Sequence, residues 1–203
     1  MDSEIETVLD FWVGFDPEDA AALEHAYKRW FSSTPADDRA LEARFGDLVE
    51  RAGKNELAAW ARSPRGRLAL IIVLDQFPRN LYRGSAAAFA SDPSALELTE
   101  RGIAAGHDRT LSQLERVFFY MPLQHAESIE VQRESLRIFE ALSAERAPEP
   151  LAKLLGNVAK FAHLHADIIE RFGRFPHRNK QLGRETTAAE AAYLRDGGPT
   201  FGQ

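Results

Sequence analysis

The sequence predicts an all-α fold, an irregular array of about eight to ten helices arranged as tetratricopeptide-repeat-like helical hairpins. Three observations predict it. Apolar residues recur at helical spacing along most of the chain, Pro and Gly separate these segments, and no second β-branched run exists for a strand to pair with. A chain of 203 residues, 44% of them apolar, can bury one core. We therefore expect a single domain over residues 1–203, with a flexible tail from about residue 197.

The N-terminal quarter is expected to form three amphipathic helices, because its apolar residues recur every three or four positions. The first helix ends near Gly14, Asp16 caps the second with Pro17 in its first turn, and the third begins near Pro35. The side chains that these helices are expected to bury are Ile5, Val8, Leu9, Trp12, Leu23, Tyr27, Trp30, Phe31, Leu41, Phe45, Leu48 and Val49.

The next segment is the most apolar of the chain. Asn55 is expected to cap a short helix with Leu57 and Trp60, and Ser63-Pro64 then starts a helix that contains the apolar run 68–74. A helix that is apolar on all sides lies inside a protein. The run is much shorter than the roughly 20 residues that cross a bilayer, so we expect no contact with a membrane.

The second half of the chain is expected to add five helices and to contain the longest one. Its helical pattern starts again at Asp92-Pro93 and ends in Gly197-Gly198-Pro199. The expected helices are 92–106 with Leu96, Leu98 and Ile103 buried, 111–120, 127–142, 151–172 with His165 on its apolar stripe, and 187–195.

Composition excludes several classes of function. The net charge of −6 argues against nucleic-acid binding, which requires a basic face. No cysteine is present, so disulfides, thiol nucleophiles and thiolate zinc sites are excluded. Phosphate-loop, dinucleotide, zincin and serine-hydrolase motifs are also missing. The acidic N-terminus does not resemble a signal peptide, and we expect a cytoplasmic location.

Two segments of similar sequence each follow an apolar helix. The first corner (75–84) and the second corner (174–184) both contain Phe-Pro, then Arg-Asn, then Leu, and end in an Arg beside a Gly. Because Pro disfavours a helical conformation in the residue before it, both helices are expected to stop or kink there. The polar side chains then project from the corners: Gln76, Arg79, Asn80, Arg83, Arg174, His177, Arg178 and Asn179.

These side chains have two interpretations. A guanidinium group binds carboxylate or phosphate through two hydrogen bonds, so two facing corners would form a pocket for an anion. Alternatively, Arg and Asn cap the carbonyl groups at the helix ends and hold the turns. The duplication of the pattern makes the pocket about as strong a hypothesis as the structural role.

A third polar segment, residues 115–127, carries Arg116, Gln124 and His125. Pro122 is expected to break its helix and to leave Gln124 and His125 in a polar corner. His125 and His165, with Asp75 or Glu127, are candidates for acid–base catalysis, although an inward histidine is more often a hydrogen-bonded core residue. His163 and His165 point about 200° apart on a helix and cannot share an ion. His125, His165 and a carboxylate from another helix could still meet at a metal, but sequence spacing does not show it, and we expect no metal and no cofactor.

The sequence resembles a bacterial family, domain-of-unknown-function family 924. The resemblance rests on Leu-Asp-Gln-Phe-Pro-Arg-Asn from residue 74, Phe-Phe-Tyr-Met-Pro-Leu-Gln-His from residue 118, and Phe-Gly-Arg-Phe-Pro-His-Arg-Asn from residue 172. It implies an all-α fold similar to tetratricopeptide repeats and implies no activity. Gln124 and Ala126 depart from residues that are common in similar sequences. Positions that match are Asp75, Gln76, Arg79, Asn80, Arg83, Arg116, His125, Glu127, His165, Arg174, His177, Arg178, Asn179 and Arg184.

Three functions fit these residues. The first is binding of a small anionic ligand, a carboxylate or a phosphate, in a pocket lined by Arg, Asn and His. The second is an interaction module that holds a peptide or partner protein on a concave helical surface. The third is a hydrolase or lyase that uses His125 or His165 as general acid–base. We favour the first, and whether the chain is an enzyme stays open at this point.

Overall fold

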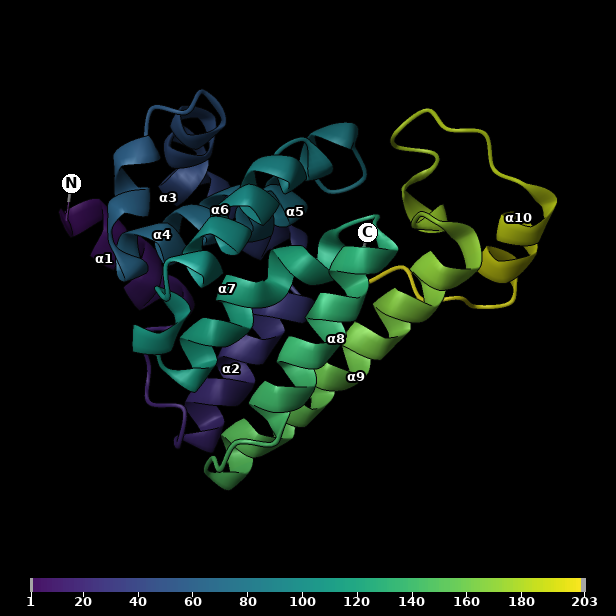
Figure 1. Cartoon of the computed structure of the whole chain (residues 1–203). Coiled ribbons are helices and arrows are strands. Elements are labelled where there is room, and N and C mark those ends of the chain that lie inside the picture. The colour runs from purple at the N-terminus through teal and green to yellow at the C-terminus, as the bar shows by residue number, and fades with distance from the viewer. Residues whose placement is uncertain (1, 202–203) are drawn as a thin grey trace.

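The computed structural model describes residues 2–201, and these residues form helices and turns without a strand (Figure 1). The predicted all-α fold is confirmed, while the likeness to tetratricopeptide repeats remains a prediction. No helix of residues 2–201 is long and apolar enough to cross a membrane. The α-helices are α1 Asp2–Trp12, α2 Ala20–Phe31, α3 Pro35–Gly53, α4 Pro64–Ile71, α5 Phe77–Leu81, α6 Asp92–Ala104, α7 Gln113–His125, α8 Ile129–Ser143, α9 Glu149–Phe172 and α10 Ala188–Arg195.

Short polar side chains begin most of these helices, as expected. Thr34 forms a capping box with Asp37 at the start of α3, and the Ser63 hydroxyl accepts a hydrogen bond from the Gly66 N–H at the start of α4. The prediction that Asp16 caps α2 is wrong. Asp19 is the cap, because its carboxylate accepts from the first backbone N–H groups of the helix, whereas Asp16 accepts from a turn before it.

Asn55 does not start a helix, contrary to prediction. It has a φ of +61° and its N–H donates to the Ala52 carbonyl, so it ends α3 in a left-handed conformation that Asn tolerates better than most residues. The next turn, the 3₁₀ helix Ala58–Arg62, begins after Leu57 and has no side-chain cap. Trp60 in this turn is buried, as predicted.

The apolar segment is the centre of the fold. Its residues 68–74 are almost completely buried, and α4 packs against α1, α6 and α7. A strand was the alternative for this run, and the helix is confirmed. Aromatic rings fill the space beside it, where the Phe77 ring lies 4.9 Å from Phe45 and 5.3 Å from Trp12. Figure 1 shows α8 and α9 side by side, forming a long hairpin that closes one flank.

Two predictions of burial are corrected by helix geometry. The buried face of α2 is Leu23, Ala26 and Trp30, so Phe31, one residue further round the helix, is 38% exposed. Leu96, Leu98 and Ile103 of α6 are only half-buried. The face of α6 that is buried consists of small residues, which let α7 approach closely: a Cβ at Gly102 would lie 2.4 Å from the Phe119 ring.

The chain does not leave the helical conformation at the first corner. Residues Ile72–Gln76 form a π-helical turn, in which the Phe77 N–H donates to the Ile72 carbonyl, and α5 continues through Pro78. Proline removes a helical hydrogen bond and its ring crowds the preceding turn, and the wider π turn accommodates both effects. The second corner behaves as predicted, because α9 ends at Phe172 with Gly173 in a left-handed cap.

Candidate functional site

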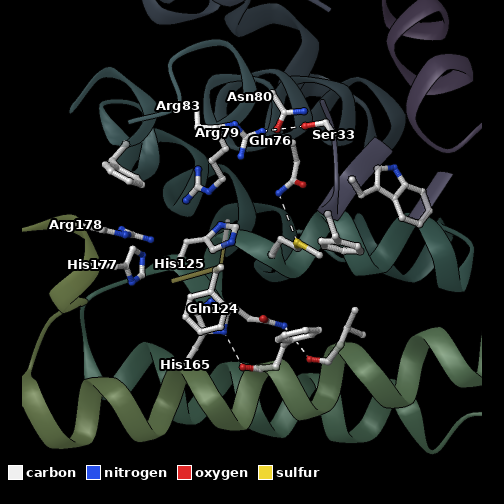
Figure 2. Close-up of a pocket in the computed structure, with 17 residues that line it drawn as sticks. Ser33, Gln76, Arg79, Asn80, Arg83, Gln124, His125, His165, His177 and Arg178 are labelled. Carbon is white, nitrogen blue, oxygen red and sulfur yellow. Dashed lines mark hydrogen bonds between the residues drawn. The ribbon is translucent and has the colours of Figure 1, made fainter. Parts of the chain in front are cut away.

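Both corners contribute to one pocket of about 250 Å³ (Figure 2). It lies where α5, the end of α7, the middle of α9 and the second corner meet. Most of the predicted ligand-binding residues line it, and they come from segments far apart in the sequence. These are Gln76, Arg79, Asn80, Arg83, Gln124, His125, His165, His177 and Arg178.

Three predicted residues lie outside the lining and hold the fold together. Arg116 forms an ion pair with Glu145 at 2.5 Å. Arg174 pairs with Glu190 at 2.7 Å, which joins the second corner to α10. Asn179 is fully buried within its turn. The structure therefore places these three residues outside the pocket.

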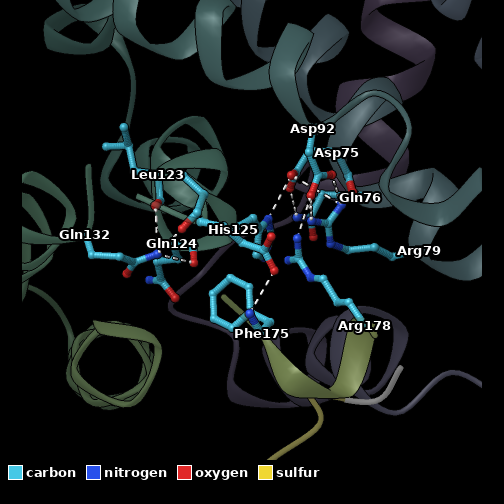
Figure 3. Close-up of polar contacts among 12 residues, drawn as sticks. Asp75, Gln76, Arg79, Asp92, Leu123, Gln124, His125, Gln132, Phe175 and Arg178 are labelled. Carbon is cyan, nitrogen blue, oxygen red and sulfur yellow. Dashed lines mark hydrogen bonds and ion pairs between the residues drawn. The ribbon is translucent and has the colours of Figure 1, made fainter. Parts of the chain in front are cut away.

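The two corners are connected through a single carboxylate, Asp92 at the start of α6 (Figure 3). Arg79 donates to its two oxygens over 3.0 and 3.1 Å, and Arg178 donates to one of them over 3.1 Å. All three side chains are largely buried. Burial lowers the pKa of Arg178 to about 10, and the neighbouring charge of Arg79 acts in the same direction.

Arg83 and Asn80 extend the first corner along the pocket. The Arg83 guanidinium donates to the Ser33 hydroxyl over 2.9 Å and to the Asp38 carboxylate over 3.3 Å. These bonds tie the loop between α2 and α3, and the first turn of α3, to the corner. Asn80 lies beside them at the upper edge of the pocket in Figure 2.

The last turn of α7 presents Gln124 and His125 to the pocket. The prediction that Pro122 breaks this helix is wrong, since α7 continues to His125. A side chain of α8 makes this ending stable: the Gln132 amide donates to the carbonyls of Gln124 and Ala126, each over 2.8 Å. Carbonyls that lack a helical partner are thereby satisfied inside the fold.

His125 forms a short contact with Asp75, and both side chains are buried. The Nδ1 atom of His125 lies 2.7 Å from Oδ1 of Asp75, while the Gln76 amide donates to the other carboxylate oxygen over 2.6 Å. Burial alone would raise the pKa of Asp75, but the charge of Arg79 and the hydrogen bond with His125 lower it below its usual value. Burial also lowers the pKa of His125, so the pair is a carboxylate and a neutral imidazole.

Two further histidines face the same pocket. The Nδ1 of His165 lies 2.7 Å from the Phe161 carbonyl, and its ring stacks on Phe201 at 3.8 Å. Burial holds the pKa of His165 well below its usual value and lowers that of His177 to about 3. Both rings are therefore neutral at pH 7. Because a carbonyl can only accept, Nδ1 of His165 carries the proton and Nε2 is an acceptor.

The similarity of this chain to known proteins extends over almost its whole length. The sequence profile of a family described as bacterial protein of unknown function, DUF924, matches residues 8–198. The chain belongs to this family. It is also similar to a solved structure of a protein of unknown function from Agrobacterium tumefaciens, with 38% identity and a TM-score of 0.79 over 97% of this chain and 99% of that one. No curated protein matches.

Sequence reasoning missed part of the lining of this DUF924 pocket. Asp92, which pairs with two lining arginines, was assigned only to the start of a helix, and nothing in the local pattern marked it as more than that. The other missed residues are mostly apolar and were assigned to the core or to no element: Trp30, Phe31, Ser33, Phe89, Met121, Val158, Phe161 and Phe201. Phe201 belongs to the segment predicted as flexible, and residues 202–203 of that segment lie outside the described residues.

Each arginine that lines the DUF924 pocket has an acidic partner, but two of them share the same one. Arg79 and Arg178 share Asp92, and Arg83 contacts Asp38. Within residues 2–201, no group of three or more His, Asp or Glu side chains is placed to hold a metal ion. The site therefore combines guanidinium and amide donors, imidazole acceptors and an apolar side, and this combination suits a small polar molecule with an apolar part.

Proposed function

We propose that this protein binds a small anionic ligand, a carboxylate or a phosphate, in the pocket between the two corners. The observation that carries the proposal is the arrangement of Arg178. Its side chain is 7% exposed and lines the pocket, yet its guanidinium has only one hydrogen bond to a carboxylate that Arg79 already engages on both oxygens. Within residues 2–201 its Nε has no hydrogen-bond partner.

This arrangement favours a further anion. A buried guanidinium without enough acceptors is costly, and a ligand oxygen in the pocket would supply a further acceptor to its terminal nitrogens through charge-assisted hydrogen bonds. The lowered pKa of Arg178 has the same origin, because burial and repulsion from Arg79 outweigh the attraction of Asp92. The neutral histidines and amides nearby can bind other polar atoms of the ligand.

The volume of the pocket and its apolar side indicate how large the ligand is and that part of it is apolar. A volume of about 250 Å³ is close to the lower end of the range for ligand pockets, about 300–1,000 Å³. A metabolite with one acidic group fits this space better than a nucleotide. The rings of Trp30, Phe89 and Phe161 and the side chain of Met121 would cover its apolar part.

A thermal-shift screen with small carboxylates and phosphates tests the proposal. A ligand at 100 times its Kd adds about 2.7 kcal/mol to the free energy of unfolding. For a chain of this size, that corresponds to a rise in Tm of roughly 5–10 °C. Arg178→Gln should lose this response, while Arg116→Gln, which removes an ion pair outside the pocket, should keep it. If no compound in the screen raises the Tm of the wild type, the proposal is wrong.

A further inference from the structure

The Asp75–His125 pair has the geometry of a positioned base. The Asp75 carboxylate is completely buried and ionised, so the His125 nitrogen that faces it, Nδ1, must carry the imidazole proton. In the neutral ring, Nε2 then has a free lone pair. His125 lines the pocket, and Figure 2 shows its ring among the other polar lining side chains. A base with a fixed tautomer therefore faces the ligand space.

Burying this pair is an unfavourable way to stabilise a fold. A buried carboxylate costs several kcal/mol in lost hydration, and apolar side chains of similar volume often stabilise a core as well or better. Asp75 also requires support from Arg79, whose guanidinium lies 3.4 Å from the carboxylate and donates to the Asp75 carbonyl over 2.5 Å. A structural need alone does not account for so many buried charges beside a cavity.

The π turn is a second and independent observation. π turns are rare, and they occur frequently at functional sites. This one consists of Ile72–Gln76 and ends with Asp75 and Gln76. An extra residue in the turn rotates the side chains that follow relative to those before it, by about 100° per residue. The turn thereby lets α4 bury its apolar side chains on all sides while Asp75 faces His125.

The lining residues favour base catalysis over a covalent nucleophile. The chain has no cysteine, and the Ser33 hydroxyl is already bonded to Asp38 and to Arg83. His165 is a weaker candidate for the base than His125, because its Nδ1–H is held by a carbonyl and not by a carboxylate. The guanidinium groups of Arg79 and Arg178, which line the same pocket as His125, can stabilise the negative charge that proton removal creates.

We propose that the pocket is an enzyme site that removes a proton from a small oxo carboxylic acid, with His125 as the general base and Asp75 as its positioning residue. The inference rests on the proposed anion binding. Arg178 holds the substrate carboxylate. His125 Nε2 takes a proton from the carbon next to the ketone, the C–H electron pair forms the C=C bond of an enolate, and the carbonyl π pair moves to oxygen beside the guanidinium groups. His125 then returns a proton to the substrate, so no oxidant or reductant is needed.

Exchange of substrate hydrogen with solvent measures this step directly. Pyruvate and 2-oxobutyrate are the probes, incubated with the full chain in D₂O and followed by loss of the proton NMR signal at C3. The wild type should catalyse deuterium incorporation. His125→Gln should lower the rate about 100-fold or more, the usual contribution of a general base. His163→Gln changes a half-exposed histidine of α9 and should leave the rate unchanged.

Asp75→Asn tests the positioning role through the pH midpoint of the exchange rate, which a smaller amount of folded protein alone would not shift. The Asp75 charge raises the pKa of His125, so removing it should move the midpoint of the exchange rate to lower pH, in addition to slowing the reaction. Circular dichroism verifies that each variant is folded. If Asp75→Asn does not fold, the catalytic role of His125 is tested by the deuterium-exchange rate and the probe binding of His125→Gln alone.

Titration calorimetry with the same probes separates the two proposals. Binding together with exchange that depends on His125 supports both. Binding by a wild type that exchanges no faster than His125→Gln overturns the catalytic role and leaves the binding pocket intact. A wild type that binds other anions but neither probe overturns the assignment to oxo acids. A wild type that binds no anion overturns the proposed function and this inference with it.

Discussion

Asp92→Asn should destabilise the protein strongly, because one carboxylate is the shared ion-pair partner of two buried guanidinium groups. Its oxygens lie 3.0 and 3.1 Å from Arg79 and 3.1 Å from Arg178. Removing one partner of a buried ion pair costs about 3–5 kcal/mol. Because the Asp92 side chain is still 16% exposed and Asn keeps one acceptor oxygen, we expect the lower end of this range, about 3 kcal/mol.

Urea denaturation followed by circular dichroism measures this loss as a fall in the midpoint at an unchanged m-value. Glu134→Gln is the matched control. It removes an exposed pair with Arg137 on the surface of α8, and such pairs contribute at most about 1 kcal/mol. A loss below about 1 kcal/mol in Asp92→Asn would refute the idea that this carboxylate joins the corners.

The same variant has a second consequence for anions. Without the Asp92 charge, Arg79 and Arg178 repel each other at short range, and an added anion can take the place of the carboxylate. Phosphate or acetate should therefore raise the Tm of Asp92→Asn more than that of the wild type. Equal shifts in the two proteins would mean that the anion binds elsewhere.

Three further predictions concern the core, the histidines and a helix cap. Phe77→Ala removes a fully buried ring and should cost about 3–5 kcal/mol in urea, whereas Leu164→Ala on the exposed face of α9 should cost little. Burial lowers the pKa of His177 to about 3, so between pH 6.5 and 3 the unfolded chain binds more protons and stability falls as the pH falls. His177→Gln should reduce that loss by roughly 1 kcal/mol per pH unit in a urea titration over pH 5–6.5, close to the limit of about 1.4 kcal/mol that applies once the unfolded ring is fully protonated. Thr34→Ala should cost about 1 kcal/mol, and Thr7→Ala, within α1, much less.

Each of these three predictions has an outcome that would contradict it. A Phe77→Ala protein as stable as the wild type would mean that the aromatic cluster repacks without a cavity. Identical pH dependence with and without His177 would mean that this ring is protonated in the folded state. Equal effects of the two threonine substitutions would mean that the capping box of α3 contributes no more than an ordinary helix position.

The sequence predicted the helices well, because local patterns determine them. Apolar spacing and the Ser, Thr, Pro and Gly signals placed the buried stripes of α1, α3 and α9 and most helix ends. The errors occurred where long-range contacts override local preference. Pro122 lies inside α7 because packing and the Gln132 amide stabilise the helix end, and Pro78 is accommodated by a π turn.

The similarity of the two corners predicted which side chains share a pocket, and most of them do. It did not predict the partner that joins them. Asp92 is 13 residues from Arg79 and 86 from Arg178, and nothing in the local pattern marks it as more than the first residue of a helix. Likewise, the Asp75–His125 contact spans 50 residues.

Local chemistry in the chain thus determines the all-α class, the helix positions and the polar corners, since each depends on residues within a few turns of one another. Only the tertiary structure decides which arginines face the pocket, which acid pairs with them and which histidine nitrogen carries the proton. Those properties depend on burial and on distances between segments that the fold brings together. The same side chains in separate helices would be hydrated, and they would have neither the altered pKa values nor a common cavity.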